Sequence, residues 1–185
     1  NAAHAPAAIA ALEAGKHVLC EKPMAMNTAE ALAMEAAAEK AGKLLMIGFV
    51  RRYGNDCAVV RSLLPQVGEI YYAKASYLRR HGFPGGWFGD KRYSGGGPLI
   101  DLGVHVIDLA RYLMGNPRPV SVYGACFDKL GCRPELKSAK GEYQSTSADP
   151  RFAYNVEDLA SAMIRFDNGA VLAVEASFDL HIRES

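Results

Sequence analysis

The sequence predicts an α/β part over residues 1–50, followed by an α+β part over residues 51–185. Residues 1–50 alternate helix, strand, helix and strand with short connections, which favours a parallel, doubly wound sheet. The later strand-like segments alternate apolar and polar residues, which is typical of an antiparallel or mixed sheet with one exposed face. An Asn-Gly pair between two of these segments predicts a hairpin.

The first part contains two helix–strand pairs. The expected elements are a helix over Pro6–Ala14, a strand over Lys16–Cys20, a helix from Asn27 to Ala41 and a strand over Lys43–Val50. Asn27 followed three residues later by Glu30 is a capping signal, and Gly42 is placed to end that helix. We expect these residues to be the end of an α/β domain whose beginning lies before Asn1.

The second part mixes single helices with strands. The expected elements are a helix over Asn55–Leu64 ended by Pro65, a strand over Glu69–Leu78, a helix over Pro98–Met114 ended by Gly115, a strand over Val120–Phe127, and hairpin strands over Leu159–Phe166 and Ala170–Phe178. Asn168-Gly169 predicts a tight primed turn, in which both residues have positive φ. Residues 128–155 show no periodicity, so we expect a long loop there.

Composition excludes several classes of function. Lys and Arg number 21 and Asp and Glu number 20, so the net charge of +1 does not attract nucleic acid or an anionic membrane. The longest apolar run, Leu44–Val50, is too short to cross a membrane, and we expect a soluble, cytoplasmic protein. The cysteines have neither zinc-site nor disulfide spacing, so we expect free, mostly buried thiols at Cys20, Cys57, Cys126 and Cys132.

The helix over Pro98–Met114 is apolar nearly all round, which predicts that it is buried. Asp101, His105 and Asp108 nevertheless share one stripe of it, at i, i+4 and i+7. Buried polar groups need partners, so the stripe either lines a site or is satisfied internally. The internal alternative is an Asp101–His105 pair with Asp108 bridging to Arg111. The sequence is compatible with both alternatives.

The residues around this helix suit chemistry on a hydroxyl group. Gly95-Gly96-Gly97 would let a backbone approach a ligand closely beside the helix N-terminus, although a glycine triplet is more often only a flexible loop. The positive end of the helix would keep Asp101 ionised, and His105 could take a proton from a substrate hydroxyl. A metal site is weakly supported, because Asp101 and His105 supply two ligands and no third is visible.

Glu21-Lys22-Pro23 follows the first strand at the carboxyl edge, where open α/β sheets bind ligands. A solvated Glu-Lys pair in a loop is the alternative. Asn1 and His4 occupy the analogous end of a preceding strand, and a helix-entry cap is the alternative role for Asn1.

Three stretches together resemble the Gfo/Idh/MocA family of NAD(P)-dependent oxidoreductases. They are Ala10–Met24 (AALEAGKHVLCEKPM), Gly95–Asp108 (GGGPLIDLGVHVID) and Asp158–Ser177 (DLASAMIRFDNGAVLAVEAS). The resemblance implies the C-terminal portion of a Rossmann domain in residues 1–50. It also implies a domain for substrate binding and oligomerisation in residues 51–185, with an open-faced, mostly antiparallel sheet and helices on one face. A homodimer or homotetramer would form through the open face.

The same resemblance implies roles for individual residues. Lys22, Asp101 and His105 match the catalytic constellation: His105 would be the general acid/base on the substrate hydroxyl. Lys22 would favour the alkoxide, and Asp101 would orient substrate and imidazole. Glu21, Lys22 and Pro23, with Asn1 and His4, would lie on the cofactor side. Trp87, the only tryptophan, resembles an aromatic residue that approaches the nicotinamide.

The implied activity is hydride transfer between NAD or NADP and a hydroxyl carbon of a sugar, sugar derivative or cyclitol. Two alternatives are an NAD-recycling glycosidase or lyase of the same family and a non-catalytic sensor on the same fold. The chain contains no Gly-x-Gly-x-x-Gly, and no residue in it selects NAD over NADP. We therefore expect these 185 residues alone to bind a dinucleotide weakly and to be inactive.

Overall fold

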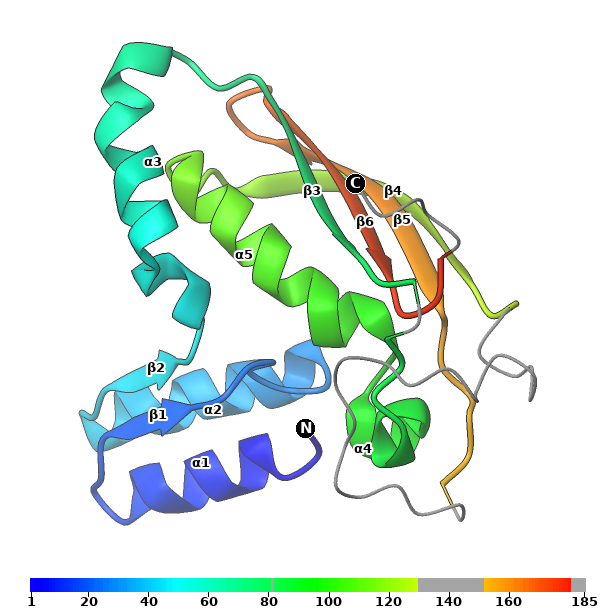
Figure 1. The fold of residues 1–185 in the computed structure, drawn as a ribbon. Coiled ribbons are helices and arrows are strands. Elements are labelled where there is room, and N and C mark those ends of the chain that lie inside the picture. Colours follow the sequence, from blue (N-terminus) through cyan, green and yellow to red (C-terminus); the bar gives the residue numbers. More distant parts are fainter. Residues whose placement is uncertain (81, 130–151, 181–185) are drawn as a thin grey trace.

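The computed structural model describes residues 1–80, 82–129 and 152–180 and contains two sheets in these ranges (Figure 1). The first is a parallel pair, β1 (Val18–Cys20) and β2 (Leu45–Ile47). The second has the order β3 (Tyr72–Leu78), β6 (Val171–Ser177), β5 (Leu159–Phe166) and β4 (Pro119–Phe127). Its β3–β6 pairing is parallel and the other two pairings are antiparallel, so the predicted α/β and α+β parts are confirmed.

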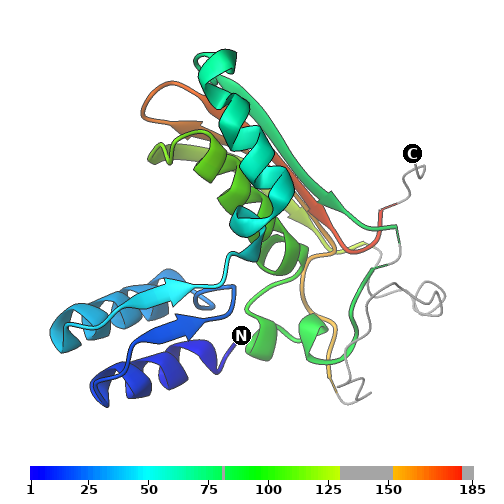
Figure 2. The same ribbon diagram turned by 60° about the vertical axis from the view of Figure 1, so that its left-hand side comes forward.

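Two helices cover the parallel pair on one side, α1 (His4–Glu13) and α2 (Thr28–Ala41) (Figures 1 and 2). The capping signal of α2 is confirmed, because Asn27 Oδ1 accepts from the Glu30 amide at 2.9 Å. The Glu30 carboxylate completes the cap by accepting from the Met26 amide at 3.0 Å. Gly42, with φ of 61°, ends the helix in the left-handed conformation that glycine adopts freely.

The connection to the second sheet differs from the expectation. The strand expected over Lys43–Val50 is only Leu45–Ile47, and a 3₁₀ turn η1 (Val50–Tyr53) follows it. Helix α3 (Asn55–Val67) continues through Pro65, which was expected to end it. The proline removes one hydrogen bond from the last turn, and the helix stops two residues later, before Gly68 with φ of 78°.

The core of the second sheet lies on the face that α5 (Val104–Leu113) crosses (Figure 1). Alternate residues along the last strand form its buried side: each is at most 2 % exposed, and they are Ala170, Leu172, Val174, Ala176 and Phe178. Val106, Ile107 and Ala110 of α5 pack against the part of this core that contains Ala170, Leu172 and Val174. Burying an aliphatic side chain such as Leu172 stabilises the fold by about 1.5–3 kcal/mol.

The predicted hairpin forms, but its turn is wider than expected. Only Gly169 has positive φ (85°), and the amide of Phe166 bonds the carbonyl of Ala170 across a three-residue loop. Asn168 instead accepts a hydrogen bond from the Ala170 amide through its side chain. A loop of this length needs one left-handed residue, so the primed-turn prediction was wrong in detail.

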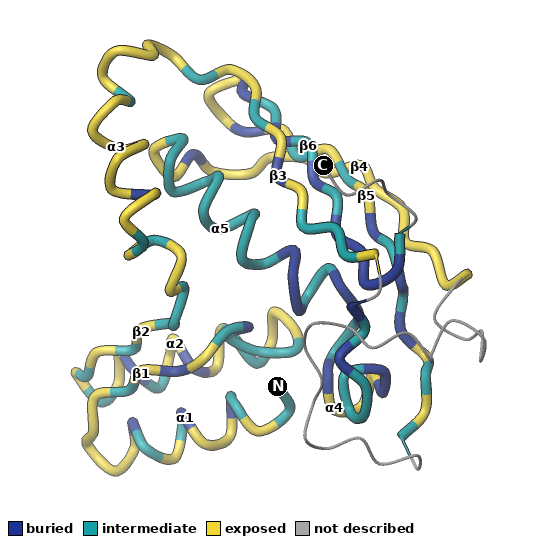
Figure 3. The backbone as a smooth tube through the Cα atoms, viewed as in Figure 1, coloured by how far each residue is buried: buried dark blue, intermediate teal, exposed yellow. Residues whose placement is uncertain are grey.

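The helix from Pro98 was expected to be buried, and the structure buries only part of its first turn. It opens with a π-helical turn η3 (Leu99–Gly103), which includes the buried Asp101, whereas every residue of α5 is only half-buried (Figure 3). One side of α5 packs on the sheet, and His105 on the helix lines a cavity, so the helix is not surrounded by protein on all sides. The short elements η2 (Gly86–Gly89) and α4 (Lys91–Ser94) precede it.

The remaining expectations have mixed outcomes. Cys20, Cys57 and Cys126 are free thiols, but Cys126 is exposed rather than buried, because β4 lies at the sheet edge. Cys132 and most of the loop expected over 128–155 lie outside the described residues. Within the described ranges, every helix falls short of the length and hydrophobicity needed to cross a bilayer.

Candidate active site

A cavity of about 330 Å³ lies where the carboxyl end of β1 meets the start of the α5 helix. Its lining residues are Asn1, His4, Glu21, Lys22, Tyr77, Arg79, Trp87, Phe88, Asp101, Leu102 and His105. These include every site residue that the sequence predicted except Pro23. Segments far apart in the chain therefore converge on one space.

Lys22 and Asp101 form the polar centre of the cavity. Lys22 follows β1 by two residues, and its Nζ donates to Asp101 Oδ1 at 2.9 Å and to the Asp101 carbonyl at 2.9 Å. The two side chains are 18 % and 12 % exposed, so solvent screens this ion pair only partly. Asp101 sits in the π-helical turn, an irregularity that often marks functional sites in helices.

His105 lies beyond Asp101 on the same helix and lines the same cavity. Its Nδ1 is buried and has no hydrogen-bond partner among the described residues. Burial lowers the pKa of the imidazole to about 4; the charges of Lys22 and Arg51 act in the same direction, and Asp101 and Glu21 oppose them. The ring is therefore neutral at pH 7 and able to accept a proton.

The internally satisfied alternative for the polar stripe was wrong. Asp101 pairs with Lys22 rather than His105, and Asp108 pairs with Arg52 rather than Arg111. Arg52 Nε donates to Asp108 Oδ2 at 2.7 Å, and its Nη2 bonds Asp108 Oδ1. Arg111 instead donates to the Pro117 carbonyl at 2.8 Å. Of the three residues on this stripe, Asp101 and His105 therefore line the cavity, whereas Asp108 forms an ion pair that connects η1 to α5.

The Arg52–Asp108 pair also has an aromatic environment. The Arg52 guanidinium lies 5.5 Å from the Phe49 ring centroid and 4.9 Å from that of Tyr112. Cation–π contacts of this kind restrict the guanidinium to one position. The connection between the two sheets is therefore fixed to the helix that carries His105.

The glycine triplet contacts protein rather than open space. A Cβ on Gly97 would lie 2.0 Å from the Glu157 carbonyl oxygen, so only glycine fits there. The Glu157 carboxylate accepts from the amides of Gly97 at 2.9 Å and Leu99 at 3.3 Å. The expectation that a ligand uses these amides was therefore wrong: Glu157 occupies them and fixes the start of the helix.

The predicted cofactor-side residues form another wall. Asn1 Nδ2 donates to the Ser94 carbonyl at 2.6 Å, so Asn1 does not cap α1, whose N-cap is Ala3. His4 Nδ1 donates to the Pro23 carbonyl at 2.7 Å, which gives Pro23 a contact just outside the cavity. The Trp87 and Phe88 rings stack with centroids 3.9 Å apart and offer an aromatic surface.

Sequence reasoning missed four lining residues, Tyr77, Arg79, Phe88 and Leu102. Tyr77 lies near the end of β3, and Arg79 directly follows that strand. Strand ends near a site supply functional residues, so this position was the available signal.

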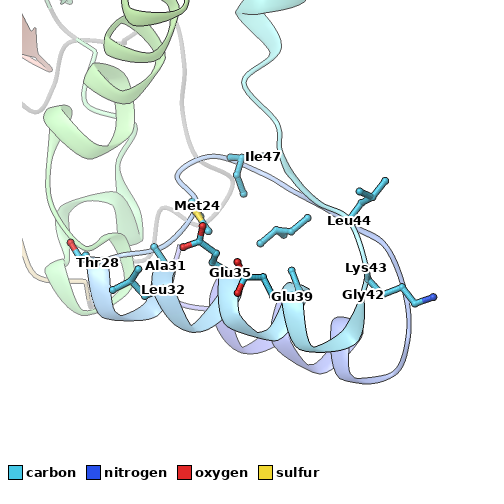
Figure 4. Close-up of a pocket in the computed structure, with 12 residues that line it drawn as sticks. Met24, Thr28, Ala31, Leu32, Glu35, Glu39, Gly42, Lys43, Leu44 and Ile47 are labelled. Carbon is cyan, nitrogen blue, oxygen red and sulfur yellow. The ribbon is translucent and has the colours of Figure 1, made fainter. Parts of the chain in front are cut away.

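A larger hollow, about 630 Å³, lies between α2 and β2 (Figure 4). Its lining is mainly apolar, from Met24 and Leu32 to Leu45 and Ile47, and it contains no predicted site residue. Across the described ranges, no three His, Cys, Asp or Glu side chains gather as a metal site requires. The smaller cavity is therefore the candidate active site.

The structure joins an α/β layer, with polar residues after a strand end, to an open mixed sheet. This combination is typical of a two-domain enzyme. Residues 1–49 match the model described as "Oxidoreductase family, NAD-binding Rossmann fold", and residues 65–184 match "GFO/IDH/MocA C-terminal domain". The second match alone spans more than half of the chain. The chain belongs to the Gfo/Idh/MocA family of oxidoreductases.

Similar proteins act on sugars according to their names. D-glucoside 3-dehydrogenase of Escherichia coli is 42 % identical over 187 residues, which cover 100 % of this chain and 51 % of that protein. Levoglucosan dehydrogenase of Pseudarthrobacter phenanthrenivorans is 34 % identical over 194 residues, which cover 100 % of this chain and 49 % of that protein. The chain thus spans about half the length of the curated relatives it matches.

Solved structures show the same fold. A levoglucosan dehydrogenase in complex with NADH superposes with a TM-score of 0.81 at 34 % identity, over 100 % of this chain and 47 % of that one. The aldose-aldose oxidoreductase from Caulobacter crescentus, complexed with glycerol, gives 0.77 at 31 % identity, over 97 % and 49 %.

Proposed function

We propose that this chain carries the catalytic residues of a dehydrogenase that transfers a hydride between NAD or NADP and a hydroxyl carbon of a sugar or cyclitol. One observation carries the proposal: a neutral His105, whose Nδ1 has no partner in the described part of the chain, lines the same cavity as the Lys22–Asp101 ion pair. An alcohol needs a base and a fixed positive charge to lose its proton as its hydride departs.

The three residues divide the work on the proton and the charge. His105 accepts the hydroxyl proton, since its lowered pKa keeps the ring neutral at pH 7. Lys22 donates to the substrate oxygen and stabilises the developing alkoxide. Asp101 holds the Lys22 ammonium in place by accepting two hydrogen bonds from it. The expected role of Asp101 thus shifts toward positioning Lys22.

The residues present fit the nicotinamide end of a dinucleotide. The stacked Trp87–Phe88 pair offers an aromatic surface, and Asn1 and His4 line the same cavity, each hydrogen-bonded to a backbone carbonyl. When bound, the nicotinamide exchanges a hydride with the carbon that bears the hydroxyl. No glycine-rich pyrophosphate motif occurs in the chain, so the proposal covers this end of the cofactor.

We assign residues 1–50 to a dinucleotide-binding domain and residues 51–185 to a domain for substrate and subunit contacts. The outer face of the four-stranded sheet carries exposed apolar side chains, among them Tyr123 at 84 % and Met163 at 52 %. Exposed apolar patches of this kind mark interfaces, which supports a homodimer or homotetramer through this face.

The test is turnover of the full-length protein with NAD and with NADP. Candidate substrates are methyl glucoside, levoglucosan and myo-inositol, and the readout is net formation of reduced nicotinamide. His105→Ala should lower kcat by roughly 10²–10⁴-fold, the usual contribution of a general base. His17→Ala is the matched control, because His17 is exposed and its Nδ1 accepts from the Leu44 amide, away from the cavity.

Net reduced nicotinamide also separates a dehydrogenase from a recycling glycosidase or lyase, which regenerates its cofactor in each cycle. Glycoside cleavage without net reduction would contradict the proposal. Unchanged turnover in His105→Ala would show that another group is the base.

A further inference from the structure

Two arginines flank one tyrosine beside the catalytic groups; we call Arg51, Tyr77 and Arg79 the arginine–tyrosine cluster. Each guanidinium carbon lies 5.3 Å from the Tyr77 ring centroid. The Tyr77 hydroxyl accepts from Arg51 Nη2 at 3.4 Å and from Arg79 Nη2 at 3.4 Å. Arg79 Nη1 also donates to the Gly82 carbonyl at 3.0 Å, so its position is fixed from two sides.

Neither guanidinium has a counter-ion within the described ranges. The ion pairs there engage other residues, and the nearby Lys22 is already paired with Asp101. Glu21 is the other carboxylate that lines the cavity, and its Oε2 accepts from the Lys22 amide at 3.2 Å. Arg79 therefore lines the cavity and Arg51 adjoins it through Tyr77, while Glu21 is the one lining carboxylate outside an ion pair.

A half-buried guanidinium is stabilised when an anion meets it, and its planar fork suits carboxylate and phosphate oxygens. Arg79 lines the cavity, and Arg51, which is exposed, contacts the same Tyr77 ring. Because Tyr77 holds both groups in advance, an arriving anion does not have to order them.

We propose that the arginine–tyrosine cluster binds an anionic substituent, a carboxylate or a phosphate, on the sugar substrate. The proposal rests on the dehydrogenase function above and narrows its substrate class. A neutral sugar would leave both charges without a counter-ion.

The cluster lies at a useful distance from the reacting hydroxyl. The Tyr77 and His105 ring centroids are 6.4 Å apart. A sugar with its reacting hydroxyl at His105 would then present a substituent from the far side of its ring to the arginines. Burial alone would raise the pKa of the Tyr77 hydroxyl, but hydrogen bonds and charge from Arg79 and Arg51 lower it, which shows how positive this wall is.

The experiment compares charged and neutral substrates in the full-length protein. The matched pairs are methyl glucuronide against methyl glucoside, and glucose 6-phosphate against glucose. We expect the charged substrate of at least one pair to have a higher kcat/KM than its neutral counterpart. The pair with the larger ratio identifies the preferred anion as a carboxylate or a phosphate. Arg79→Met should lower the charged-to-neutral ratio by about ten- to hundredfold, mainly through KM, because a charge-assisted hydrogen bond is lost.

Two further variants serve as comparisons for Arg79→Met. Tyr77→Phe keeps the ring between the arginines but removes the shared acceptor, so it should reduce the ratio less than Arg79→Met. Arg118→Met is the control, because Arg118 is 74 % exposed and pairs with Asp167 at the hairpin turn. Its ratio should equal that of the wild type.

Inorganic phosphate, titrated calorimetrically, gives a readout that is independent of turnover. Wild-type protein should bind it and Arg79→Met should bind it more weakly. Equal kcat/KM for charged and neutral sugars, together with phosphate binding unaffected by Arg79→Met, would overturn the anion site while leaving the dehydrogenase intact. Arg79-dependent phosphate binding without oxidation of any sugar would support the anion site and contradict the dehydrogenase.

Discussion

Lys22 holds Asp101 at two points, since its Nζ lies 2.9 Å from the Asp101 carbonyl oxygen and 2.9 Å from Oδ1. One residue follows β1, and the other lies in the π-helical turn before α5. The same ammonium that would stabilise an alkoxide therefore also joins the parallel layer to the helix carrying His105. The proposed catalytic role of Lys22 and the relative position of the two parts would therefore be linked through this pair.

Lys22→Met should lower both the stability of the fold and the rate of the proposed reaction. It leaves the Asp101 carboxylate, 12 % exposed, without its cation, which should lower the free energy of unfolding by about 1–3 kcal/mol. It should also lower kcat by about 10²–10³-fold, because a group that stabilises developing charge is lost. Denaturant unfolding and steady-state kinetics measure the two effects. In a cycle with Asp101→Asn, strictly additive changes would contradict the coupling.

The pH dependence of kcat/KM for oxidation should reflect His105. The base works only when neutral, so activity falls as pH drops through its pKa. Because burial lowers that pKa to about 4, the acid limb of the free enzyme should lie well below the ordinary histidine value of about 6.5. An acid limb at the ordinary value would mean that the cavity is wetter than its geometry indicates.

Burial is the largest cause of the lowered His105 pKa, and Arg51→Met tests one of the smaller, electrostatic causes. The Arg51 charge disfavours protonation of His105, so its removal should move the acid limb to higher pH. The linked effect on stability has a definite sign. The unfolded chain binds a proton at higher pH than the folded one, so His105 favours unfolding as pH falls from about 6.5 towards 4. Arg118→Met should leave the limb in place.

Much of the fold was predictable because its signals are local. The Asn27–Glu30 cap, the glycine at position 42 and the alternation along β6 each specify their element through nearby residues. The Gfo/Idh/MocA motifs added the expectation that Lys22, Asp101 and His105 share a site. The structure places them around one cavity, while their catalytic roles remain proposals.

The parts that were not predictable depend on contacts between distant residues. Nothing near Gly97 in the sequence indicates that Glu157 caps it, and nothing near Asp108 indicates that Arg52 is its partner. Half-burial of α5 likewise depends on what packs against each side, which an all-round apolar pattern does not show. Pairing across such separations is set by tertiary packing.

Glu157 should act as a positioning residue for the helix that carries Asp101 and His105. Glu157→Ala removes the acceptor for the Gly97 and Leu99 amides, which should cost about 0.5–2 kcal/mol of stability, as for other lost caps. It should also lower kcat. Glu157→Gln keeps one acceptor and should restore part of kcat, and exposed Glu13→Gln is the control. A loss of stability without any loss of kcat would contradict the positioning role.

The outer face of the four-stranded sheet should hold subunits together. Tyr123 of β4 and Met163 of β5 are cross-strand partners on this face, and they are 84 % and 52 % exposed. Placing a carboxylate at both positions, Tyr123→Glu with Met163→Glu, would bury unpaired charge at the interface, which costs several kcal/mol. Sedimentation velocity should find the wild type as a dimer or tetramer and the double variant as a smaller species. Lys74→Glu, on the same face but in a solvent-exposed pair with Glu175, should weaken assembly less. A full-length wild type that stays monomeric at high concentration would show that another surface, or none, serves for assembly.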